Sequence, residues 1–253
     1  MQYGFAYCTL LAHGLGDRTD SCNHGARMTY VFPPVQQASL PIKGSDKLFP
    51  VHRIYCVGRN YDEHTREMGG DTKDPPFFFQ KNADNVATNG KFPYPSQTKN
   101  VHFEVEMVVG LKSGGTNIKA EDALKHVFGY AVGIDMTRRD LQDAAKKLAR
   151  PWEVAKAFEY SAPCTALVPA DSIGHPKKGA IWLDVNGERR QTGDLSQMIW
   201  DVPSQIAFLS TLFELKAGDL IFSGTPSGVG AIKAGDRMKA HIDGVGDLEV
   251  AVV

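Results

Sequence analysis

Residues 102–109 read His-Phe-Glu-Val-Glu-Met-Val-Val, and this stretch indicates most clearly how the chain folds. Apolar side chains occupy every second position from Phe103 to Val109, which is the period of a β-strand that buries one face in a core. Glu104 and Glu106 both fall on the opposite face of that strand. The stretch therefore predicts a half-buried strand that carries two neighbouring carboxylates.

Short apolar runs bounded by turn residues continue on both sides of this strand. They predict strands over residues 54–58, 77–81, 103–111, 129–134, 181–185, 219–223, 237–242 and 248–253. Helical spacing predicts helices over residues 61–68, 120–127, 138–148 and 203–213. Asn186-Gly187 between two apolar runs is typical of a two-residue hairpin. A doubly wound sheet would need a regular alternation of strands and helices, and the sequence does not show one. The expected class is α+β, mainly β.

The composition limits the possible partners and the compartment. A chain of 253 residues with 42% hydrophobic content can bury one substantial core. Its 28 basic and 29 acidic residues nearly cancel, so neither nucleic acid nor an anionic membrane is expected as a partner. No apolar stretch approaches the roughly 20 residues of a membrane-spanning helix, so we expect a soluble protein. Four scattered cysteines argue against a zinc ribbon or a disulfide framework and fit a reducing cytoplasm.

The first part of the chain lacks these patterns. Residues 5–15 are apolar, but no Lys or Arg precedes them and no clear cleavage pattern follows, which argues against a secretory signal. We expect residues 1–27 to be either a disordered extension or sequence ahead of the true translation start. The expected division is an extension and lead-in over residues 1–50 and a catalytic domain over residues 51–253.

The two glutamates and a later aspartate are candidate metal ligands. Neighbouring carboxylates disfavour each other's ionisation unless a cation lies between them. Asp135 directly follows the apolar run of residues 130–134, where binding residues often stand on a rigid base. Three oxygen ligands without Cys or His suit Mg²⁺ or Mn²⁺ rather than structural zinc. Two alternatives remain open from the residues alone, which are a solvated strand face for Glu104 and Glu106 and a helix cap for Asp135.

Further candidates are a pair of residues on a predicted helix and a single lysine. His64 and Glu67 are three positions apart, so they share a helix face and the carboxylate can orient the imidazole as a base. An exposed polar pair is the alternative. Lys156 has apolar neighbours and is either a partly desolvated ammonium that faces an anion or a surface lysine with a buried stem.

A glycine-rich segment follows the strand predicted at residues 219–223. Residues 223–230 read Ser-Gly-Thr-Pro-Ser-Gly-Val-Gly, and their glycines allow backbone N–H groups to approach a carboxylate closely. The segment lacks the Lys-Ser/Thr ending of a nucleotide-binding Walker loop. It is either a substrate-binding loop or a structural turn.

Several separated motifs occur together between residues 51 and 253, and their joint occurrence is more specific than any one of them. They are Gly58-Arg59-Asn60-Tyr61 with His64 and Glu67, Glu104-Val105-Glu106, Asp135, Arg139, Gln142, Lys156 and Gly224-Thr225-Pro226-Ser227-Gly228-Val229-Gly230. In this order they resemble the fumarylacetoacetate hydrolase family. Within it, residues 57–68, 75–81, 93–96 and 150–153 are most similar to bacterial fumarylpyruvate hydrolases. Residues 1–27 have no counterpart in the resemblance.

The resemblance implies a fold and a set of residue roles. The fold is a mixed β-sheet roll or sandwich with short peripheral helices, often dimeric. Mg²⁺ or Mn²⁺ is held by the positions that match Glu104, Glu106 and Asp135, and those that match His64 and Glu67 form a water-activating dyad. The implied substrate contacts are Lys81, Arg139, Gln142, Lys156 and Thr225, and Lys156 also stabilises the metal site. We add Arg59 as the partner of a second substrate carboxylate, because a guanidinium fork matches that group.

The expected function is that of a metal-dependent hydrolase that cleaves a carbon–carbon bond in a 2,4-diketo acid. Fumarylpyruvate, from the catabolism of aromatic compounds, would give fumarate and pyruvate in the cytoplasm of the cell, and the enzyme would be a homodimer. Alternatives on the same fold are an acylpyruvase, an oxaloacetate decarboxylase, and a decarboxylase or isomerase of dienoic diacids. An alternative from another class is a non-catalytic metal-binding module, against which the presence of both His64 and Glu67 counts.

Overall fold

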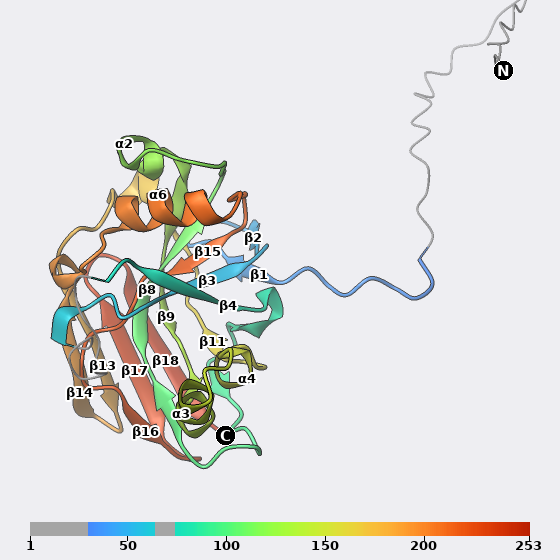
Figure 1. Ribbon diagram of the computed structural model, residues 1–253, viewed down its shortest axis with the longest axis vertical. Helices are drawn as coiled ribbons and strands as arrows, with labels where there is room; N and C mark the ends of the chain where they lie inside the picture. Colours follow the sequence, from blue (N-terminus) through green and yellow to red (C-terminus); the bar gives the residue numbers. More distant parts are fainter. Residues whose placement is uncertain (1–29, 64–73) are drawn as a thin grey trace, which may run out of the picture. The chain divides into compact units, whose positions relative to one another are not determined.

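The computed structural model describes residues 30–63 and 74–253. By its internal contacts the chain separates into two units, residues 1–36 and residues 37–253, and the fold described below is that of the second unit (Figure 1). The functional division after residue 50 stays a prediction.

Two mixed sheets form the body of this unit (Figure 1). The six-stranded sheet contains, in spatial order, β12 (Val168–Pro169), β9 (Val127–Ile134), β8 (Val105–Leu111), β15 (Leu220–Phe222), β3 (Ile54–Gly58) and β4 (Phe77–Lys81). The five-stranded sheet contains β14 (Glu188–Asp194), β13 (Ala180–Val185), β17 (Arg237–Ile242), β18 (Gly246–Val252) and β6 (Lys91–Phe92). Neighbours are antiparallel except for β15 with β3 and β18 with β6, which are parallel.

The alternation of side chains places a core on each face of the six-stranded sheet. Met107 and Val109 of β8 belong to one core cluster, which also contains Leu183 of β13 in the five-stranded sheet. Val108 points to the other face and belongs to a second cluster, which contains Phe49 of the hairpin formed by β1 (Ser39–Pro41) and β2 (Leu48–Pro50). This alternation follows from the two-residue period of a strand and holds β8 in the middle of the unit.

Smaller elements complete the unit. A three-stranded sheet contains β10 (Thr137–Arg138), β7 (Val101–Phe103) and β16 (Gly230–Ile232), and a parallel pair contains β11 (Ala162–Pro163) and β5 (Val86–Ala87). The described helices are α2 (Ala120–Ala123), α3 (Arg139–Lys147), α4 (Glu153–Lys156), α5 (Ala170–Ile173) and α6 (Val202–Leu212). Three-residue 3₁₀ turns are η1 (Ala83–Asn85), η2 (Leu124–His126) and η3 (Leu195–Gln197). The expected class, mainly β with short helices, is confirmed.

The sequence-based elements agree with the structure where the apolar pattern was clear. β3, β4 and β17 span the predicted residues, and the turn at Asn186 and Gly187 has the positive φ values, 53° and 85°, of a tight hairpin. Two predictions were wrong in detail. The strand predicted at residues 103–111 is interrupted at Glu104, and the helix predicted at residues 120–127 continues past Ala123 only as a 3₁₀ turn.

Other elements escaped the sequence analysis or lie beyond it. β14 was missed because it begins with the exposed charged residues Glu188, Arg189 and Arg190, which hide its alternation. The helix predicted at residues 61–68 falls mostly outside the described residues, which include only its helical positions Asp62 and Glu63. Within the described part of the chain, no helix is long and apolar enough to span a membrane.

Candidate active site

The pairing of β8 with β9 brings three carboxylates to one face of the six-stranded sheet. Val105 lies opposite Ile134 and Glu106 lies opposite Gly133 in this antiparallel pair. One step beyond, the backbone N–H of Asp135 donates to the carbonyl oxygen of Glu104 at 2.8 Å. The side chains of Glu104 and Asp135 are therefore direct cross-strand neighbours, an arrangement of like charges that is unfavourable without a cation.

The interruption at Glu104 occurs where the chain passes from one sheet to another. β7 before it belongs to the three-stranded sheet, and β8 after it belongs to the six-stranded sheet. At this point the backbone N–H of Val105 donates to the side-chain Oε1 of Gln191 at 3.0 Å. The side-chain amide of Gln191 therefore accepts the hydrogen bond that a neighbouring strand would otherwise accept, and the side chains of Glu104 and Glu106 still point to the same face.

The three carboxylates are buried together. Glu104, Glu106 and Asp135 are 6%, 2% and 0% exposed, which excludes a solvated strand face. Each offers an oxygen that lies within 4.8 Å of the oxygens offered by the other two. Asp135 is not a helix cap either, because α3 begins at Arg139 and its N-terminal flanking residue is Arg138.

The electrostatics of Glu106 test whether this group fits a divalent cation. Burial raises the pKa of Glu106 well above its ordinary value, the negative charges of Asp135 and Glu104 raise it further, and the N–H of Gly224, 2.7 Å from Oε2, opposes them. A cation between the three carboxylates removes the like-charge cost and favours the ionised form of Glu106. The hard oxygen donors and their spacing therefore fit a divalent ion such as Mg²⁺ or Mn²⁺.

Lys156 reaches the carboxylates from the end of α4. It is 2% exposed, which excludes a surface lysine, and its Nζ lies 2.8 Å from Oε2 of Glu104 and 2.7 Å from Oδ2 of Asp135. Nζ also donates to the hydroxyl of Thr137 at 2.6 Å. Burial acts to lower the pKa of Lys156, but the charges of Asp135 and Glu104 outweigh it and raise that pKa. The ammonium is therefore protonated at neutral pH and stabilises negative charge.

Two more cations contact the same carboxylates. Nη2 of Arg139 lies 2.5 Å from Oε1 of Glu104, and Nη1 donates to Oε1 of Gln142 at 2.5 Å. Lys81 is fully buried behind Asp135, with its Nζ 2.8 Å from Oδ1, and does not line the hollow described below. Glu104 and Asp135 thus pair with three cationic side chains, so the charges of the cluster balance only when Glu106 is also ionised.

A histidine next to the cluster holds Arg139 in place. Burial and the nearby charge of Arg139 lower the pKa of His102 to about 4, so its imidazole is neutral. Its Nδ1 accepts from Nε of Arg139 at 3.3 Å, which leaves Nε2 to donate to Oδ1 of Asn100 at 3.0 Å. The guanidinium thereby receives a fixed orientation toward Glu104.

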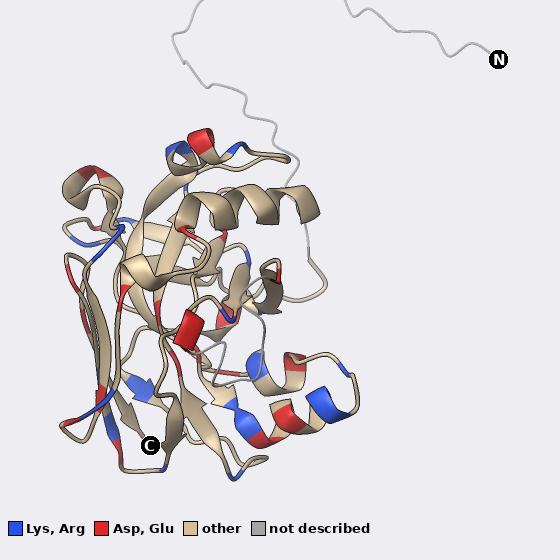
Figure 2. Cartoon of the chain, turned by 60° about the vertical axis from the view of Figure 1, so that its left-hand side comes forward, with Lys and Arg blue, Asp and Glu red and all other residues tan. Residues whose placement is uncertain are grey.

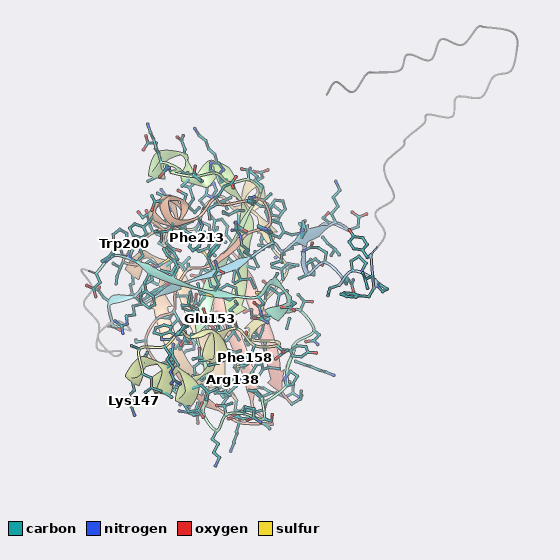
Figure 3. All side chains as sticks on the ribbon, turned by 45° about the vertical axis from the view of Figure 1, so that its right-hand side comes forward. Arg138, Lys147, Glu153, Phe158, Trp200 and Phe213 are labelled. Carbon is teal, nitrogen blue, oxygen red and sulfur yellow. The ribbon has the colours of Figure 1, made fainter. Side chains whose placement is uncertain are left out.

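The glycine-rich segment follows β15 and approaches the carboxylates through its backbone. Gly224 has a φ of 98°, and a Cβ at this position would lie 2.6 Å from the Cβ of Asn60, so only glycine fits. Asn60 fixes this approach because its Nδ2 donates to the carbonyl oxygen of Ser223 at 2.7 Å and to that of Trp200 at 2.9 Å. Of these residues, Trp200 is labelled in Figure 3. The backbone of the segment therefore contacts Glu106 directly, and its role as a substrate-binding loop stays a prediction.

A narrow hollow opens beside these groups. Its polar lining consists of Arg59, Glu104, Glu106, Gln142, Lys146, Lys156 and Thr225, and its apolar lining of Val57, Gly58, Phe77, Phe79 and Trp152. The rings of Phe77 and Trp152 meet edge to face at 5.4 Å, and Arg59 lies over Phe77 at 5.9 Å. The volume is about 30 Å³, enough for an ion or a water, so the lining side chains have to move apart when a diketo acid binds.

The structure thus gathers most of the residues that the sequence predicted. Glu104, Asp135, Arg139 and Lys156 form one hydrogen-bonded and ion-paired cluster, Glu106 lies beside its two carboxylates, and the hollow is lined also by Arg59, Gln142 and Thr225. His64 and Glu67 lie outside the described residues. Over the elements in view in Figure 2, basic and acidic residues are interspersed, as the charge balance of the sequence predicted.

Sequence reasoning missed several residues at the site. Gln191, His102 and the aromatic wall of Phe77, Phe79 and Trp152 were not predicted. The only signal for Gln191 was its position after the Asn-Gly hairpin, which places it opposite Leu183 and therefore inward. The aromatic wall joins two segments far apart in the sequence, so no local pattern marks it.

Comparisons with known proteins agree with this geometry. Residues 53–253 match the family model of the fumarylacetoacetate hydrolase C-terminal region. A fumarylpyruvate hydrolase from Pseudomonas aeruginosa, solved in complex with Mn²⁺ and pyruvate, is 52% identical with a TM-score of 0.87, and the match covers 89% of this chain and 99% of that chain.

Curated relatives carry two kinds of activity in their names. A fumarylpyruvate hydrolase from Ralstonia is 38% identical, over 70% of this chain and 92% of its own length. A mitochondrial oxaloacetate tautomerase from Rattus norvegicus is 42% identical, over 79% of this chain and 90% of its own length. Both kinds of relative are matched over most of their length.

Proposed function

Because this chain belongs to the fumarylacetoacetate hydrolase family, we propose that it hydrolyses the carbon–carbon bond between the two carbonyl groups of a 2,4-diketo acid. The substrate we favour is fumarylpyruvate, which gives fumarate and pyruvate. The observation that carries the proposal is the cluster of Glu104, Glu106 and Asp135, whose oxygens lie within 4.8 Å of one another and two of which, Glu104 and Asp135, contact a buried ammonium. The structural relative with Mn²⁺ and pyruvate supports the same class of ligand.

The charges at the site favour a dianionic substrate. Three carboxylates and three cationic side chains cancel once a divalent ion favours the ionised form of Glu106, so the two charges of the ion, together with Arg59 and Lys146 in the lining of the hollow, leave the site positive. Fumarylpyruvate and oxaloacetate each carry two carboxylates, whereas an acylpyruvate with an uncharged acyl group carries only one. When bound, the ion supplies Lewis-acid polarisation of the α-keto acid and stabilises enolate charge.

The aromatic wall distinguishes between these two dianions. Phe77, Phe79 and Trp152 present flat apolar surface beside the carboxylates. The planar unsaturated chain of fumarylpyruvate can pack against such a surface, whereas oxaloacetate has no apolar part of that size. Oxaloacetate tautomerisation or decarboxylation remains the second candidate function, because several curated relatives carry those names.

We propose the following residue roles, of which those of His64 and Glu67 rest on the family resemblance because both residues lie outside the described part of the chain. His64, oriented by Glu67, takes a proton from water as the water oxygen bonds to the distal carbonyl carbon. The adjacent carbon–carbon bond then breaks, and its electron pair stays with the pyruvate fragment as an enolate, which takes up a proton to complete the reaction. The ammonium of Lys156 stabilises that enolate charge. Thr225 and Gln142, which line the hollow, hold the α-keto acid end. Arg139 supports this end through Glu104 and Gln142, and Lys81 supports it through Asp135.

The assembly and location of the protein form a second part of the proposal. We infer that the chain is a homodimer that acts on a product of aromatic catabolism in the cytoplasm. Cys56 and Cys164, the two cysteines that the structure describes, are both free and buried, which supports a reducing compartment. Light scattering of the purified protein tests the dimer, and a monomer at micromolar concentration contradicts it.

A substrate panel tests the reaction. Protein stripped with a chelator and restored with Mn²⁺ or Mg²⁺ is followed by the loss of the enol absorbance of fumarylpyruvate, acetylpyruvate and oxaloacetate in parallel. We expect metal-dependent turnover with the highest kcat/KM on fumarylpyruvate. Highest kcat/KM on oxaloacetate assigns the second candidate function instead, and full activity of the stripped protein contradicts the metal site.

Arg59→Ala tests the contact with the distal carboxylate. Arg59 lines the hollow and lies over the ring of Phe77. Loss of a charge-assisted hydrogen bond is worth about 1.5–3 kcal/mol, so kcat/KM for fumarylpyruvate should fall by about 10- to 150-fold. The kcat/KM for acetylpyruvate, which lacks this carboxylate, should stay within about threefold. An equal fall for both substrates contradicts the assignment.

A further inference from the structure

A buried glutamine connects the metal-ligand strand to the glycine-rich loop. Gln191 of β14 is 0% exposed, although the residues before it on the strand are charged and exposed. Its Oε1 accepts from the N–H of Val105, between Glu104 and Glu106, at 3.0 Å. Its Nε2 donates to Oγ1 of Thr225 and to the carbonyl oxygen of Pro226, each at 2.8 Å. One side chain thus contacts both the ligand strand and the loop.

The partners of Gln191 fix the direction of its amide. The N–H of Val105 can only donate, and the carbonyl oxygen of Pro226 can only accept. The oxygen of the amide must therefore face the strand, and its NH₂ group must face the loop. Both N–H groups are used, so the hydroxyl oxygen of Thr225 receives one of them.

The direction of this bond decides what Thr225 can do. A hydroxyl has one proton, and because its oxygen already accepts from Gln191, that proton remains available for another acceptor. Thr225 lines the hollow with Arg59, Gln142 and Lys156, all of which can donate to an anion.

We propose that Gln191 is a positioning residue that holds the Thr225 hydroxyl as a hydrogen-bond donor toward the carboxylate of an α-keto acid in the hollow. It acts through Thr225 and does not itself line the hollow. The identity of the anion rests on the proposed function, but the direction of the hydroxyl rests only on the hydrogen bonds of Gln191.

Two substitutions separate the roles of the amide. Gln191→Glu keeps the shape and the acceptor for Val105 but presents a carboxylate to Thr225, so the hydroxyl turns to donate toward residue 191. Gln191→Met keeps the volume without a donor and avoids a buried charge. Pyruvate, with Mn²⁺ present, serves as the probe, and calorimetry gives its Kd. Binding of Mn²⁺ alone and the thermal midpoint are measured for the same proteins.

We expect both variants to weaken pyruvate binding by about 10- to 100-fold, the range for a lost hydrogen bond to a charged group, with the Kd of Mn²⁺ within about threefold of wild type. In turnover, KM should rise more than kcat falls. Thr225→Val should weaken pyruvate to a similar extent, and adding Gln191→Glu to it should cause little further loss. Thr225→Ser, which keeps the hydroxyl, should restore most of the affinity.

Gln205→Met is the matched control, because Gln205 is also 0% exposed and donates through its amide, to the carbonyl oxygen of Trp200 at 2.7 Å. It should lower the thermal midpoint without changing the Kd of pyruvate. Full additivity of Gln191→Glu with Thr225→Val, or unchanged pyruvate binding in both Gln191 variants, overturns the proposal. A parallel loss of Mn²⁺ affinity also overturns it, because the loss of pyruvate binding then comes from a disturbed ligand strand and not from Thr225.

The proposed function can fail separately from this inference. Wild-type protein that binds pyruvate with Mn²⁺ but hydrolyses no diketo acid contradicts the function and leaves the comparison of variants valid. Wild-type protein that binds no pyruvate in the presence of Mn²⁺ overturns both.

Discussion

Glu106→Gln is expected to weaken Mn²⁺ binding strongly and to lower turnover of the α-keto acid substrate by about three orders of magnitude or more. Lewis-acid stabilisation by a bound ion is worth several kcal/mol, and each 1.36 kcal/mol is about tenfold in rate. The substitution removes one of three anionic ligands but keeps the length of the side chain. The glutamine carbonyl can still accept from the N–H of Gly224, which lies 2.7 Å from Oε2 of Glu106.

The thermal stability of metal-free Glu106→Gln is expected to be equal to or higher than that of wild type, although its metal binding and turnover are lower. Burial, followed by the charges of Asp135 and Glu104, raises the pKa of Glu106, so the folded protein favours its protonated form. A group with a raised folded pKa stabilises the fold at low pH, and that stabilisation is lost as the pH rises through the folded pKa. Above that pH, metal-free Glu106→Gln should therefore melt at or above the wild-type temperature, whereas wild type should gain more from added Mn²⁺.

Calorimetry with Mn²⁺, thermal melts with and without metal, and steady-state turnover check these outcomes. Glu249→Gln is a suitable control, since Glu249 is exposed on β18 and its carboxylate lies 3.7 Å from Nζ of Lys239. It removes one negative charge far from the hollow and should change none of the three measurements. Wild-type Mn²⁺ affinity in Glu106→Gln excludes Glu106 as a ligand. Asp135 is a poorer first choice, because its removal leaves Lys81 and Lys156 short of a partner and destabilises the fold.

His64→Ala is expected to lower turnover by about two to four orders of magnitude while Mn²⁺ and pyruvate bind as in wild type. A positioned base contributes to the transition state for water attack and not to holding the metal or the product. Two residues shortly before position 64 have contacts distant in sequence: Tyr61 forms a β-bridge with Met198, and Glu63 accepts a hydrogen bond from Ser227 of the glycine-rich loop at 3.1 Å. Glu67→Gln should cause a smaller loss, because it removes the orientation of the imidazole but not the base.

His126→Ala controls for the loss of a histidine. His126 forms an exposed hydrogen bond with the hydroxyl of Ser113 and does not line the hollow, so this variant should turn over the substrate at the wild-type rate. Turnover is followed with fumarylpyruvate, and calorimetry gives the Kd of Mn²⁺ and pyruvate. Normal turnover in His64→Ala removes the dyad from the mechanism. A matching loss of Mn²⁺ affinity assigns His64 to the metal instead.

The strongest sequence predictions were those with a local cause. Apolar alternation located β3, β4, β8 and β17, and the Asn186-Gly187 turn required its positive φ values. The residues alone placed Glu104 and Glu106 on one face, but they left open whether that face was solvated. Similarly, the residues around Lys156 left open whether its ammonium faces a buried anion or the solvent. In each case the family resemblance, and not the local sequence pattern, favoured one of the two alternatives.

The chain's own residues therefore determined the period of its strands, the shared face of Glu104 and Glu106, and the position of Asp135 at the end of a strand, because each depends on backbone geometry over a few residues. Only the tertiary structure decided that these three carboxylates are buried together, that Glu104 and Asp135 pair with buried cations, and that Gln191 bridges Val105 and Thr225. Burial and long-range hydrogen bonds depend on which strands become neighbours, and β14 pairs with β13 while its Gln191 reaches β8 in the other sheet. No window of a few residues contains that information.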